Sequence, residues 1–324
     1  MALPDVLVIG APKAGSTAVH AALASHPALA MSTPKEPKYF LCGDEPPPAQ
    51  HGPGDAHSRR EWIWRRSEYE ALWNDAPEGA LLGESTPFYL WDTGSHIRIA
   101  EVVPEARLIA VVRDPVDRAY SNWTHLWSDG YEPIGDFVEA TELERERSEA
   151  GWAPFWRYLD LGRYGRQLQH LYRYVPADQV HVLRYRELVD EPAETLARIA
   201  AFLDIDPDGF GPVRGENVTA WVPETPANQA LRAVVRAGAW AGQFPPPEVW
   251  RTVERPLRGV LRRHRAQRPD LTPEQRRRVQ RHFVDDIALL SDLTGRDFRD
   301  WLGQEGRGAY SVRRSWAPSG RDAS

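Results

Sequence analysis

Residues 6–17, with the sequence VLVIGAPKAGST, decide the fold class, because they join a strand to a helix through a loop that contains glycine. The four apolar residues Val6–Ile9 predict a buried strand, which Gly10 ends. Helical spacing begins at Ala18 and continues to Ser25, before a His-Pro pair that stops the helix. We therefore expect a strand, a loop and a helix in succession, which is the repeating unit of an α/β fold.

Short apolar strands alternate with helical stretches along the rest of the chain. Arg107–Val112 and Val180–Leu183 are rich in apolar and β-branched residues and predict two more buried strands. Further helices are expected at residues 61–72, 116–127, 161–174, 192–203 and 273–293. This alternation predicts an α/β fold with a central parallel sheet flanked by helices, a three-layer arrangement like that of P-loop proteins.

The length of 324 residues is compatible with one large domain or two ordinary ones. Because no internal repeat and no clear linker divides the chain, we expect a single domain over residues 1–304. Proline-rich stretches predict a variable insertion at residues 42–75, and a loop with a helical cap at residues 205–270. Residues 305–324 are expected to form a C-terminal tail.

The composition excludes several classes of protein. Apolar residues make up 42% of the chain and charged residues 27%, which are values of a globular protein. No apolar run approaches the roughly 20 residues that span a bilayer, and no signal peptide is expected. The net charge of −6 gives no general attraction to nucleic acid. The one cysteine, Cys42, cannot form an internal disulfide, which favours a reducing, cytoplasmic location.

Lysine is rare in this chain. Only three of the 40 Lys and Arg residues are lysines, and Lys13, Lys35 and Lys38 all lie near its start. The ammonium of lysine is a compact charge on a flexible stem, whereas the guanidinium of arginine is planar and larger. In a chain that otherwise uses arginine, we expect the three lysines to mark positions where a small cation is needed.

The loop between the first strand and the first helix predicts an anion site. The N–H groups of such a turn converge, and the N-terminus of the helix adds positive potential. Lys13 lies in the turn, and Ser16 and Thr17 bring hydroxyl groups to the start of the helix. A P-loop for nucleoside triphosphates has its lysine directly after the last glycine. Here Lys13 precedes Gly15 by two residues, which disfavours an ordinary ATPase or kinase.

A second candidate anion site follows the strand at Arg107–Val112. Arg113 lies just past the end of the strand, and Ser121 follows eight residues later within the next helix. Ligands of open parallel sheets bind beyond the carboxyl ends of the strands. An arginine and a serine at this spacing can hold one phosphate between them, while Asp114 and Asp117 are expected to cap the helix.

Together, the two segments resemble the sulfotransferases that use 3′-phosphoadenosine 5′-phosphosulfate (PAPS). Residues 12–17 are similar to the Pro-Lys-x-Gly-Thr/Ser-Thr loop of that family, and residues 113–121 are similar to its 3′-phosphate site. Residues 35–40, Lys-Glu-Pro-Lys-Tyr-Phe, resemble a segment of the branch that contains heparan sulfate sulfotransferases and their bacterial relatives. The resemblance covers about residues 5–300 and implies an α/β core with one PAPS site and no metal.

The resemblance implies that the first loop binds the 5′ end of PAPS. Lys13 would bind the 5′-phosphate and the bridging oxygen, where negative charge collects as the sulfuryl group leaves. Ser16 and Thr17 would hold oxygens of the 5′-phosphate through hydroxyl and N–H groups. Ala14 and Gly15 belong to the same cofactor-binding loop.

The resemblance also implies which residues bind the other end of the donor. Arg113 and Ser121 would hold the 3′-phosphate, which distinguishes PAPS from ATP-like nucleotides. Tyr185 matches a tyrosine of the family that can contact adenine. The sulfuryl group would be transferred in line, leaving 3′-phosphoadenosine 5′-phosphate as the product.

The expected acceptor is a hydroxyl or an amine of a carbohydrate, a lipid or a small molecule, and it needs a base. Glu36 occupies the position of the family's glutamate and is expected to take the proton. The alternative is that Glu36 only fixes its loop by pairing with a neighbouring cation. Lys35, Lys38 and Glu84 are candidates for contacts with the acceptor or the sulfonate. Glu84 and His20 are the rival candidates for the base.

Two positions depart from the pattern of the family. Relatives in this branch often have a lysine after the glutamate of the later motif, where this chain has Ser85. The late glycine-rich basic loop of the family has no clear match, although Arg265 and Arg268 lie near its expected place. Two other functions are considered: a nucleotide phosphotransferase that reuses the loop, and a non-catalytic relative that binds an adenosine phosphate or a glycan.

Overall fold

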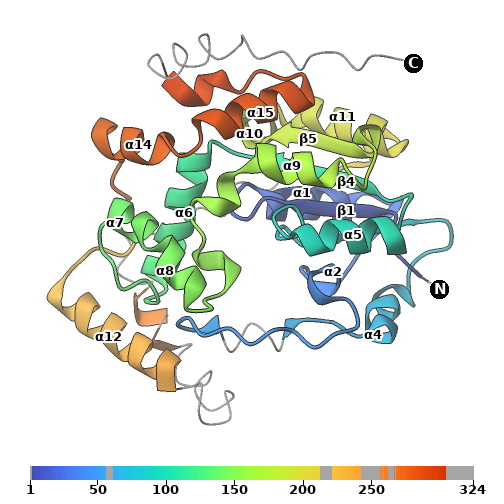
Figure 1. The fold of residues 1–324 in the computed structure, drawn as a ribbon. Coiled ribbons are helices and arrows are strands. Elements are labelled where there is room, and N and C mark those ends of the chain that lie inside the picture. The colour runs from blue at the N-terminus through green and yellow to red at the C-terminus, as the bar shows by residue number, and fades with distance from the viewer. Residues whose placement is uncertain are drawn as a thin grey trace, which may run out of the picture.

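A computed structural model of the chain describes residues 2–55, 61–211, 221–241, 256–257, 259–261, 266 and 268–303. The strands are β1 (Val6–Gly10), β2 (Leu29–Met31), β3 (Leu81–Ser85), β4 (Arg107–Val112) and β5 (Val180–Arg184). They form a five-stranded parallel sheet in the order β2-β3-β1-β4-β5, with β1 at its centre (Figure 1). The predicted α/β fold with a central parallel sheet is confirmed.

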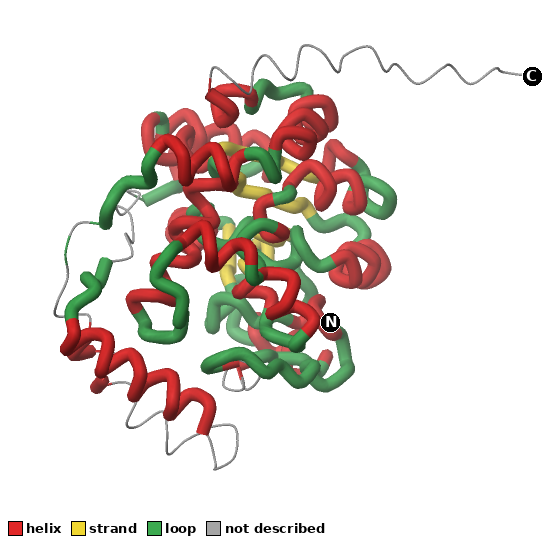
Figure 2. The backbone as a smooth tube through the Cα atoms, turned by 60° about the vertical axis from the view of Figure 1, so that its left-hand side comes forward, coloured by secondary structure: helices red, strands yellow, loops and turns green. Residues whose placement is uncertain are grey.

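Helices cover both faces of the sheet (Figures 1 and 2). The buried side chains of β1 alternate, so that Val6 and Val8 face one side while Leu7 and Ile9 face the other. The first side packs against α1 (Ser16–Ser25), α10 (Tyr185–Asp190) and α11 (Pro192–Leu203). The second side packs against α2 (Tyr39–Cys42), α5 (Thr93–Val102), α6 (Pro115–Ser128), α9 (Tyr164–Leu171) and α15 (Val284–Thr294). The protein therefore has the predicted three layers.

The other described helices lie toward the carboxyl end of the sheet or at the periphery. They are α4 (Arg66–Glu70), α7 (Phe137–Glu142), α8 (Glu144–Glu149), α12 (Pro226–Ala241) and α14 (Pro273–Gln280). In Figures 1 and 2, α12 lies at the edge of the molecule. The segment before it is tied to α6, because Trp127 donates from Nε1 to the carbonyl oxygen of Val222 at 3.2 Å. None of the described helices is long and apolar enough to span a membrane.

Several elements differ from the sequence predictions. The helix expected at 273–293 is broken into α14 and α15 by a turn, in which the N–H groups of His282 and Phe283 donate to carbonyl oxygens three residues earlier. The helix expected at 61–72 shrinks to α4 and a short 3-10 turn, since the N–H of Ile63 donates to Pro37 instead of to a helical partner. The expected tail and part of the expected cap lie outside the described residues. The single-domain boundaries stay a prediction.

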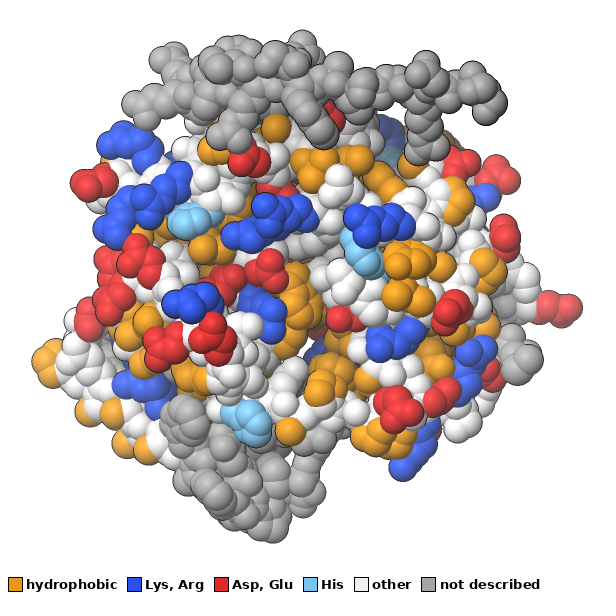
Figure 3. Space-filling view, in the orientation of Figure 1, with side chains coloured by type: hydrophobic (Ala, Val, Ile, Leu, Met, Phe, Trp, Pro, Cys, Tyr) orange, Lys and Arg blue, Asp and Glu red, His pale blue; other side chains and the backbone are white. Residues whose placement is uncertain are grey.

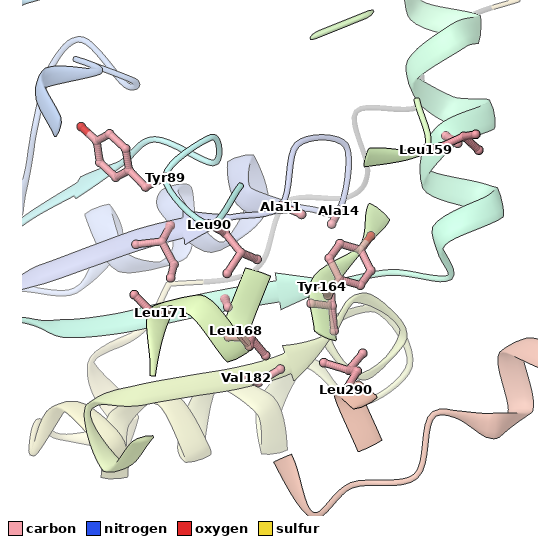
Figure 4. Close-up of a cluster of buried hydrophobic side chains, with 14 of the residues drawn as sticks. Ala11, Ala14, Tyr89, Leu90, Leu159, Tyr164, Leu168, Leu171, Val182 and Leu290 are labelled. Atoms are coloured by element: carbon pink, nitrogen blue, oxygen red, sulfur yellow. The ribbon is translucent and has the colours of Figure 1, made fainter. Parts of the chain in front are cut away.

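The loop that follows β1 is anchored in the core. Ala11 and Ala14 belong to the buried cluster that also contains Leu90 and Tyr164 (Figure 4). Leu90 lies so close to the end of β1 that a Cβ atom on Gly10 would be only 2.6 Å from its side chain. A residue larger than glycine would therefore push the loop away from the position that the core gives it.

A buried histidine pair joins α5 to α9. The ring of His96 is fully buried, and its Nε2 donates to the carbonyl oxygen of Leu90 at 3.0 Å. Its Nδ1 therefore accepts from Nδ1 of His170, at 2.9 Å. Burial, with a smaller contribution from the neighbouring His170, lowers the pKa of His96 to about 4, although the hydrogen bond to Leu90 opposes the shift, so the folded protein holds this ring neutral at neutral pH.

We expect this histidine to make the protein less stable in acid. The unfolded chain binds a proton at His96 near pH 6.5, whereas the folded chain does so near pH 4, so the free energy of unfolding falls as the pH drops between these values. The loss from pH 7 to pH 4.5 should be about 2 kcal/mol from this residue. Urea titrations of the wild type and of His96→Gln, which keeps a donor and an acceptor, would measure it. Identical pH dependence in the two proteins would contradict the prediction.

Candidate active site

The loops after β1 and β4 meet at the carboxyl end of the sheet. The two strands are hydrogen-bonded neighbours, and the chain leaves β1 toward α1 on one face and leaves β4 toward α6 on the other. Open α/β sheets bind ligands where successive connections diverge in this way. Arg113, at the end of β4, donates from Nη1 to the carbonyl oxygen of Lys13 at 3.5 Å. The two predicted anion sites therefore lie side by side.

The first predicted site is the positive end of α1. The helix begins at Ser16, directly after Gly15, which has a φ angle of 104°. Its first turn contains no acidic residue, so no carboxylate of the helix itself neutralises the positive end. The side chain of Ser16 is buried and that of Thr17 is exposed, while Ala14 packs into the core. This is the arrangement expected for a loop that binds an anion through N–H and hydroxyl groups.

Tyr185 and Arg113 complete the wall beside this loop. The guanidinium carbon of Arg113 lies 4.8 Å from the centre of the Tyr185 ring, which comes from the start of α10. A Cβ atom on Gly15 would lie 2.7 Å from the same ring, so the close approach of the ring to the loop requires glycine. Ser121 lies in α6, eight residues beyond Arg113, and is half-buried. Three predicted cofactor residues, Gly15, Arg113 and Tyr185, thus converge beside the first anion site.

Lys13 has a strongly perturbed environment. Burial lowers the pKa of its ammonium to about 8; the carboxylate of Asp129 opposes this shift, whereas the guanidinium groups of Arg113 and Arg118 add to it. The carboxylate of Glu36 also acts on Lys13, in the raising direction. Cations gathered around a loop of N–H groups favour the binding of an anion. Among the described residues, no group of three His, Cys, Asp or Glu side chains could hold a metal ion.

Arg118 holds the loop that follows β1, and this role was not predicted from the sequence. It is fully buried in α6, donates from Nη1 to the carbonyl oxygen of Pro12 at 3.3 Å, and donates from Nη2 to that of Tyr158 at 2.7 Å. Its position one helical turn after Asp114, on a face with apolar neighbours, was the signal that could have identified it. A buried guanidinium that bonds carbonyl oxygens on both sides fixes the loop relative to α6.

The segment at residues 35–40 lines a pocket. Its volume is about 500 Å³, and its lining residues are Pro34, Lys35, Glu36, Lys38 and Glu61. The Lys35 ammonium lies 2.6 Å from Oε1 of Glu36, and the Lys38 ammonium lies 5.9 Å from the centre of the Trp62 ring. One lining residue, Glu61, therefore comes from the stretch that was predicted to be a variable insertion.

Strained backbone is concentrated at this site. Lys13, Glu36 and Lys38 have φ angles of 65°, 64° and 66°, in the left-handed region that residues with a side chain rarely adopt. Such a conformation costs roughly 1–2 kcal/mol per residue and persists only where the surroundings hold it. Only one other described non-glycine residue, Asp204, has a positive φ. Strain at three candidate site residues is typical of a functional site.

Glu84 lies beneath this segment and not on the wall of the pocket. Its side chain is fully buried and accepts hydrogen bonds from the hydroxyl groups of Tyr69 at 3.0 Å, Thr86 at 2.8 Å and Tyr89 at 2.6 Å. Burial raises the pKa of Glu84 to about 7; the three hydroxyl groups oppose this shift and the charge of Glu36 adds to it. A direct contact between Glu84 and an acceptor, one of the predictions, has no support in this geometry.

Ser85 contacts the other rival base. Its Oγ lies 2.9 Å from Nδ1 of His20, and its side chain is fully buried. Burial, together with the nearby Lys35 ammonium, lowers the pKa of His20 to about 4, so His20 is neutral at neutral pH. A histidine-bonded hydroxyl therefore occupies the position where the related branch often has lysine.

Arg268 lies near the predicted 3′-phosphate site. Its guanidinium carbon is 4.4 Å from the centre of the Tyr120 ring, and the Tyr120 hydroxyl donates to the carbonyl oxygen of Pro269 at 2.8 Å. Burial lowers the pKa of Arg268, and Arg113 is among the charges that add to this shift. Arg265, the other residue considered for the late loop, lies outside the described residues.

Known proteins that are similar to this chain include sulfotransferases from eukaryotes. A membrane-associated sulfotransferase, kil1, from Dictyostelium discoideum is 24% identical over 311 residues, which cover 72% of this chain and 62% of the relative. The heparan sulfate glucosamine 3-O-sulfotransferase 3A1 of Mus musculus is 29% identical over 203 residues, which cover 63% of this chain and 46% of the relative. The chain thus spans less than two thirds of the length of these curated relatives.

The fold and the family agree with the prediction from the sequence. The crystal structure of a sulfotransferase from Alicyclobacillus acidocaldarius has the same fold, with a TM-score of 0.72 and 24% identity, and the match covers 93% of this chain and all of that one. The model of the sulfotransferase family matches residues 4–209, which contain both anion loops and the segment at 35–40. Because this match covers more than half of the chain, the protein belongs to the sulfotransferase family.

Proposed function

We propose that the protein transfers the sulfuryl group of PAPS to a hydroxyl or amine group of an acceptor. The observation that carries this proposal is the convergence of Lys13, Gly15, Arg113 and Tyr185 at the carboxyl ends of β1 and β4. Two adjacent anion sites suit a donor that carries phosphate at both ends of its ribose. The Lys13 loop would hold the 5′-phosphosulfate, and Arg113 with Ser121 would hold the 3′-phosphate.

The chemistry requires positioning and stabilisation of charge. In the in-line step, the acceptor oxygen or nitrogen bonds to sulfur while the bond from sulfur to the bridging oxygen breaks, and the electron pair of that bond goes to the 5′-phosphate. The ammonium of Lys13 would stabilise this developing charge in a partly buried site, where electrostatic interactions are stronger than in water. The phosphates of the bound donor would raise the pKa of Lys13 above its value of about 8, which keeps the ammonium protonated.

Glu36 is the proposed base that takes the proton of the acceptor. It lines the pocket of about 500 Å³, and its charge also acts on Lys13. Both oxygens of Glu84 are bonded to hydroxyl groups, and Nδ1 of His20 contacts Ser85. Of the three candidate bases, Glu36 is therefore the one that lines a space large enough for an acceptor group.

The acceptor is proposed to be a carbohydrate, a lipid or a small molecule. On the face drawn in Figure 3, the Lys and Arg side chains of the described residues are interspersed with Asp and Glu. The charged residues that line the pocket are also of both signs, with two lysines and two glutamates. This mixture does not favour a strongly anionic acceptor over a neutral one.

The preference for nucleotides tests the proposal. Calorimetric titration of the wild type with 3′,5′-adenosine bisphosphate, ATP and ADP should give the tightest binding for the bisphosphate, because only it places a phosphate at Arg113. A preference for ATP would instead favour a phosphotransferase. Turnover with PAPS then separates an enzyme from a non-catalytic binding protein.

Arg113→Ala and Ser121→Ala are expected to weaken binding of the 3′,5′-bisphosphate much more than binding of adenosine 5′-phosphate. Loss of a hydrogen bond to a charged group costs about 1.5–3 kcal/mol, or roughly ten- to a hundredfold in the dissociation constant. Calorimetry with both ligands measures the difference. Arg107→Ala is the matched control, because Arg107 lies at the opposite end of β4. Equal losses for the two ligands would show that Arg113 and Ser121 do not recognise the 3′-phosphate.

A further inference from the structure

We propose that Glu84 is a positioning residue that fixes the loop carrying Glu36 and Lys38, acting through the hydroxyl groups of Thr86 and Tyr89. This inference rests on the proposed role of Glu36 as the base. It gives a function to a buried carboxylate that the reaction itself does not use.

Two hydroxyl relays connect Glu84 to the loop. Thr86 donates to Oε2 of Glu84 at 2.8 Å, and its Oγ1 accepts from the N–H of Lys38 at 3.2 Å. Tyr89 donates to Oε1 of Glu84 at 2.6 Å, and its hydroxyl oxygen accepts from the N–H of Phe40 at 3.3 Å. Because a backbone N–H group only donates, each hydroxyl oxygen accepts from the loop, and its own hydrogen is left to point toward an oxygen of Glu84.

The backbone at Glu36 and Lys38 needs such support because the side chains of these two residues do not anchor it in the core. Glu36 and Lys38 have left-handed φ angles of 64° and 66°, and both side chains line the pocket instead of packing in the core. Lys38 is also the residue before α2, a helix of four residues, and no side-chain hydrogen bond caps that helix. The relays attach at residues 38 and 40, one inside the strained stretch and one just beyond it. They therefore fix the direction in which Glu36 and Lys38 point.

Burying a carboxylate at this place costs free energy, and this cost indicates that Glu84 has a role. Glu84 lies on β3, beside Leu7 of the central strand, and is fully buried. An apolar residue would satisfy the packing of a buried strand without any loss of hydration. Instead, the protein surrounds Glu84 with three hydroxyl groups, and two of them lead to the loop. The third, from Tyr69, donates to Oε1 at 3.0 Å, and no hydrogen bond among the described residues links its hydroxyl to the loop backbone.

This difference among the three hydroxyl groups supplies a matched experiment. Thr86→Val and Tyr89→Phe each break one relay and keep the shape of the side chain, while Tyr69→Phe removes a hydrogen bond to the same carboxylate without breaking a relay. We expect kcat for transfer from PAPS to fall roughly 10–100-fold in the two relay variants, with little change in Tyr69→Phe. The dissociation constant for 3′,5′-adenosine bisphosphate should be unchanged in all three variants. Combining Tyr89→Phe with Glu36→Gln should cost little beyond Glu36→Gln alone, because both act on the same base.

Hydrogen exchange gives a readout that does not depend on activity. The amide of Lys38 should lose protection in Thr86→Val, the amide of Phe40 should lose it in Tyr89→Phe, and both should stay protected in Tyr69→Phe. An equal fall in kcat and melting temperature in all three variants, or unchanged protection at both amides, would overturn the positioning role. If the wild type transfers no sulfuryl group while the exchange pattern follows this prediction, the proposed function fails and the relay stands.

Discussion

Lys13→Ala is expected to lower turnover by roughly 10²–10³-fold, because it removes the cation at the point where charge develops on the leaving phosphate. Binding of 3′,5′-adenosine bisphosphate should become weaker and still be measurable, since Arg113 and the N–H groups of the loop remain. Initial rates with PAPS and a titration with the bisphosphate measure the two effects. A variant that loses binding and turnover in equal proportion would show that Lys13 contributes uniformly to the ground state and the transition state.

Lys13→Arg is the sharper comparison. Both substitutions keep a Cβ atom at a residue with a φ angle of 65°, so they place the same demand on the backbone. We expect the arginine variant also to lose most of its activity, because a planar fork cannot reproduce a point contact in a loop already crowded by Arg113 and Arg118. Near-normal turnover of Lys13→Arg would contradict the proposed contact with the bridging oxygen. In the wild type, kcat/KM for PAPS should fall as the pH rises above about 8, where Lys13 of the free protein loses its proton.

Glu36→Gln is expected to lower turnover by roughly 10²–10⁴-fold and to leave the affinity for the nucleotide unchanged. The amide keeps the shape of the side chain, but it cannot accept a proton from the acceptor. Rates at saturating acceptor, together with bisphosphate titration, separate the loss of the base from a loss of binding. Lys35→Ala, which removes the cation 2.6 Å from Glu36, is the control for the ion pair.

The alternatives to a base at Glu36 predict different results for Glu36→Gln. If Glu36 only fixes the loop, Glu36→Gln should lose melting temperature and nucleotide affinity together with rate, and Lys35→Ala should do the same. If Glu84 or His20 is the base, Glu36→Gln should keep its turnover at saturating acceptor. Unchanged turnover would therefore end the assignment of Glu36 and direct attention to those two residues.

The strands that could be predicted from the sequence are those with a continuous run of apolar residues. β1, β4 and β5 were expected because each is rich in apolar and β-branched residues, and they form the part of the sheet on which the anion loops lie. The three-residue strand β2 is too short to give a pattern. β3 was not predicted, because a strand that carries buried Glu and Ser side chains does not look apolar.

The same limit applies to the candidate site. Lys13, Gly15 and Arg113 were found because they lie in loops with a recognisable spacing, and the resemblance to a family added Tyr185 and Glu36. Arg118 and the hydroxyl groups around Glu84 were not found, because their importance depends on contacts made across the fold. The Tyr69 and Tyr89 hydroxyl groups meet one carboxylate from positions 15 and 5 residues away, and no local pattern predicts that meeting.

The proposed reaction is tested by transfer of the radiolabelled sulfuryl group from PAPS to a panel of glycans, phenols and lipids by the wild type and by Lys13→Ala. We predict that the wild type labels at least one acceptor and releases one 3′-phosphoadenosine 5′-phosphate for each label transferred, while Lys13→Ala labels none at a comparable rate. Transfer of equal efficiency by Lys13→Ala would contradict the mechanism. A wild type that releases no 3′-phosphoadenosine 5′-phosphate with any acceptor, and that binds ATP more tightly than the bisphosphate, would contradict the proposed function itself.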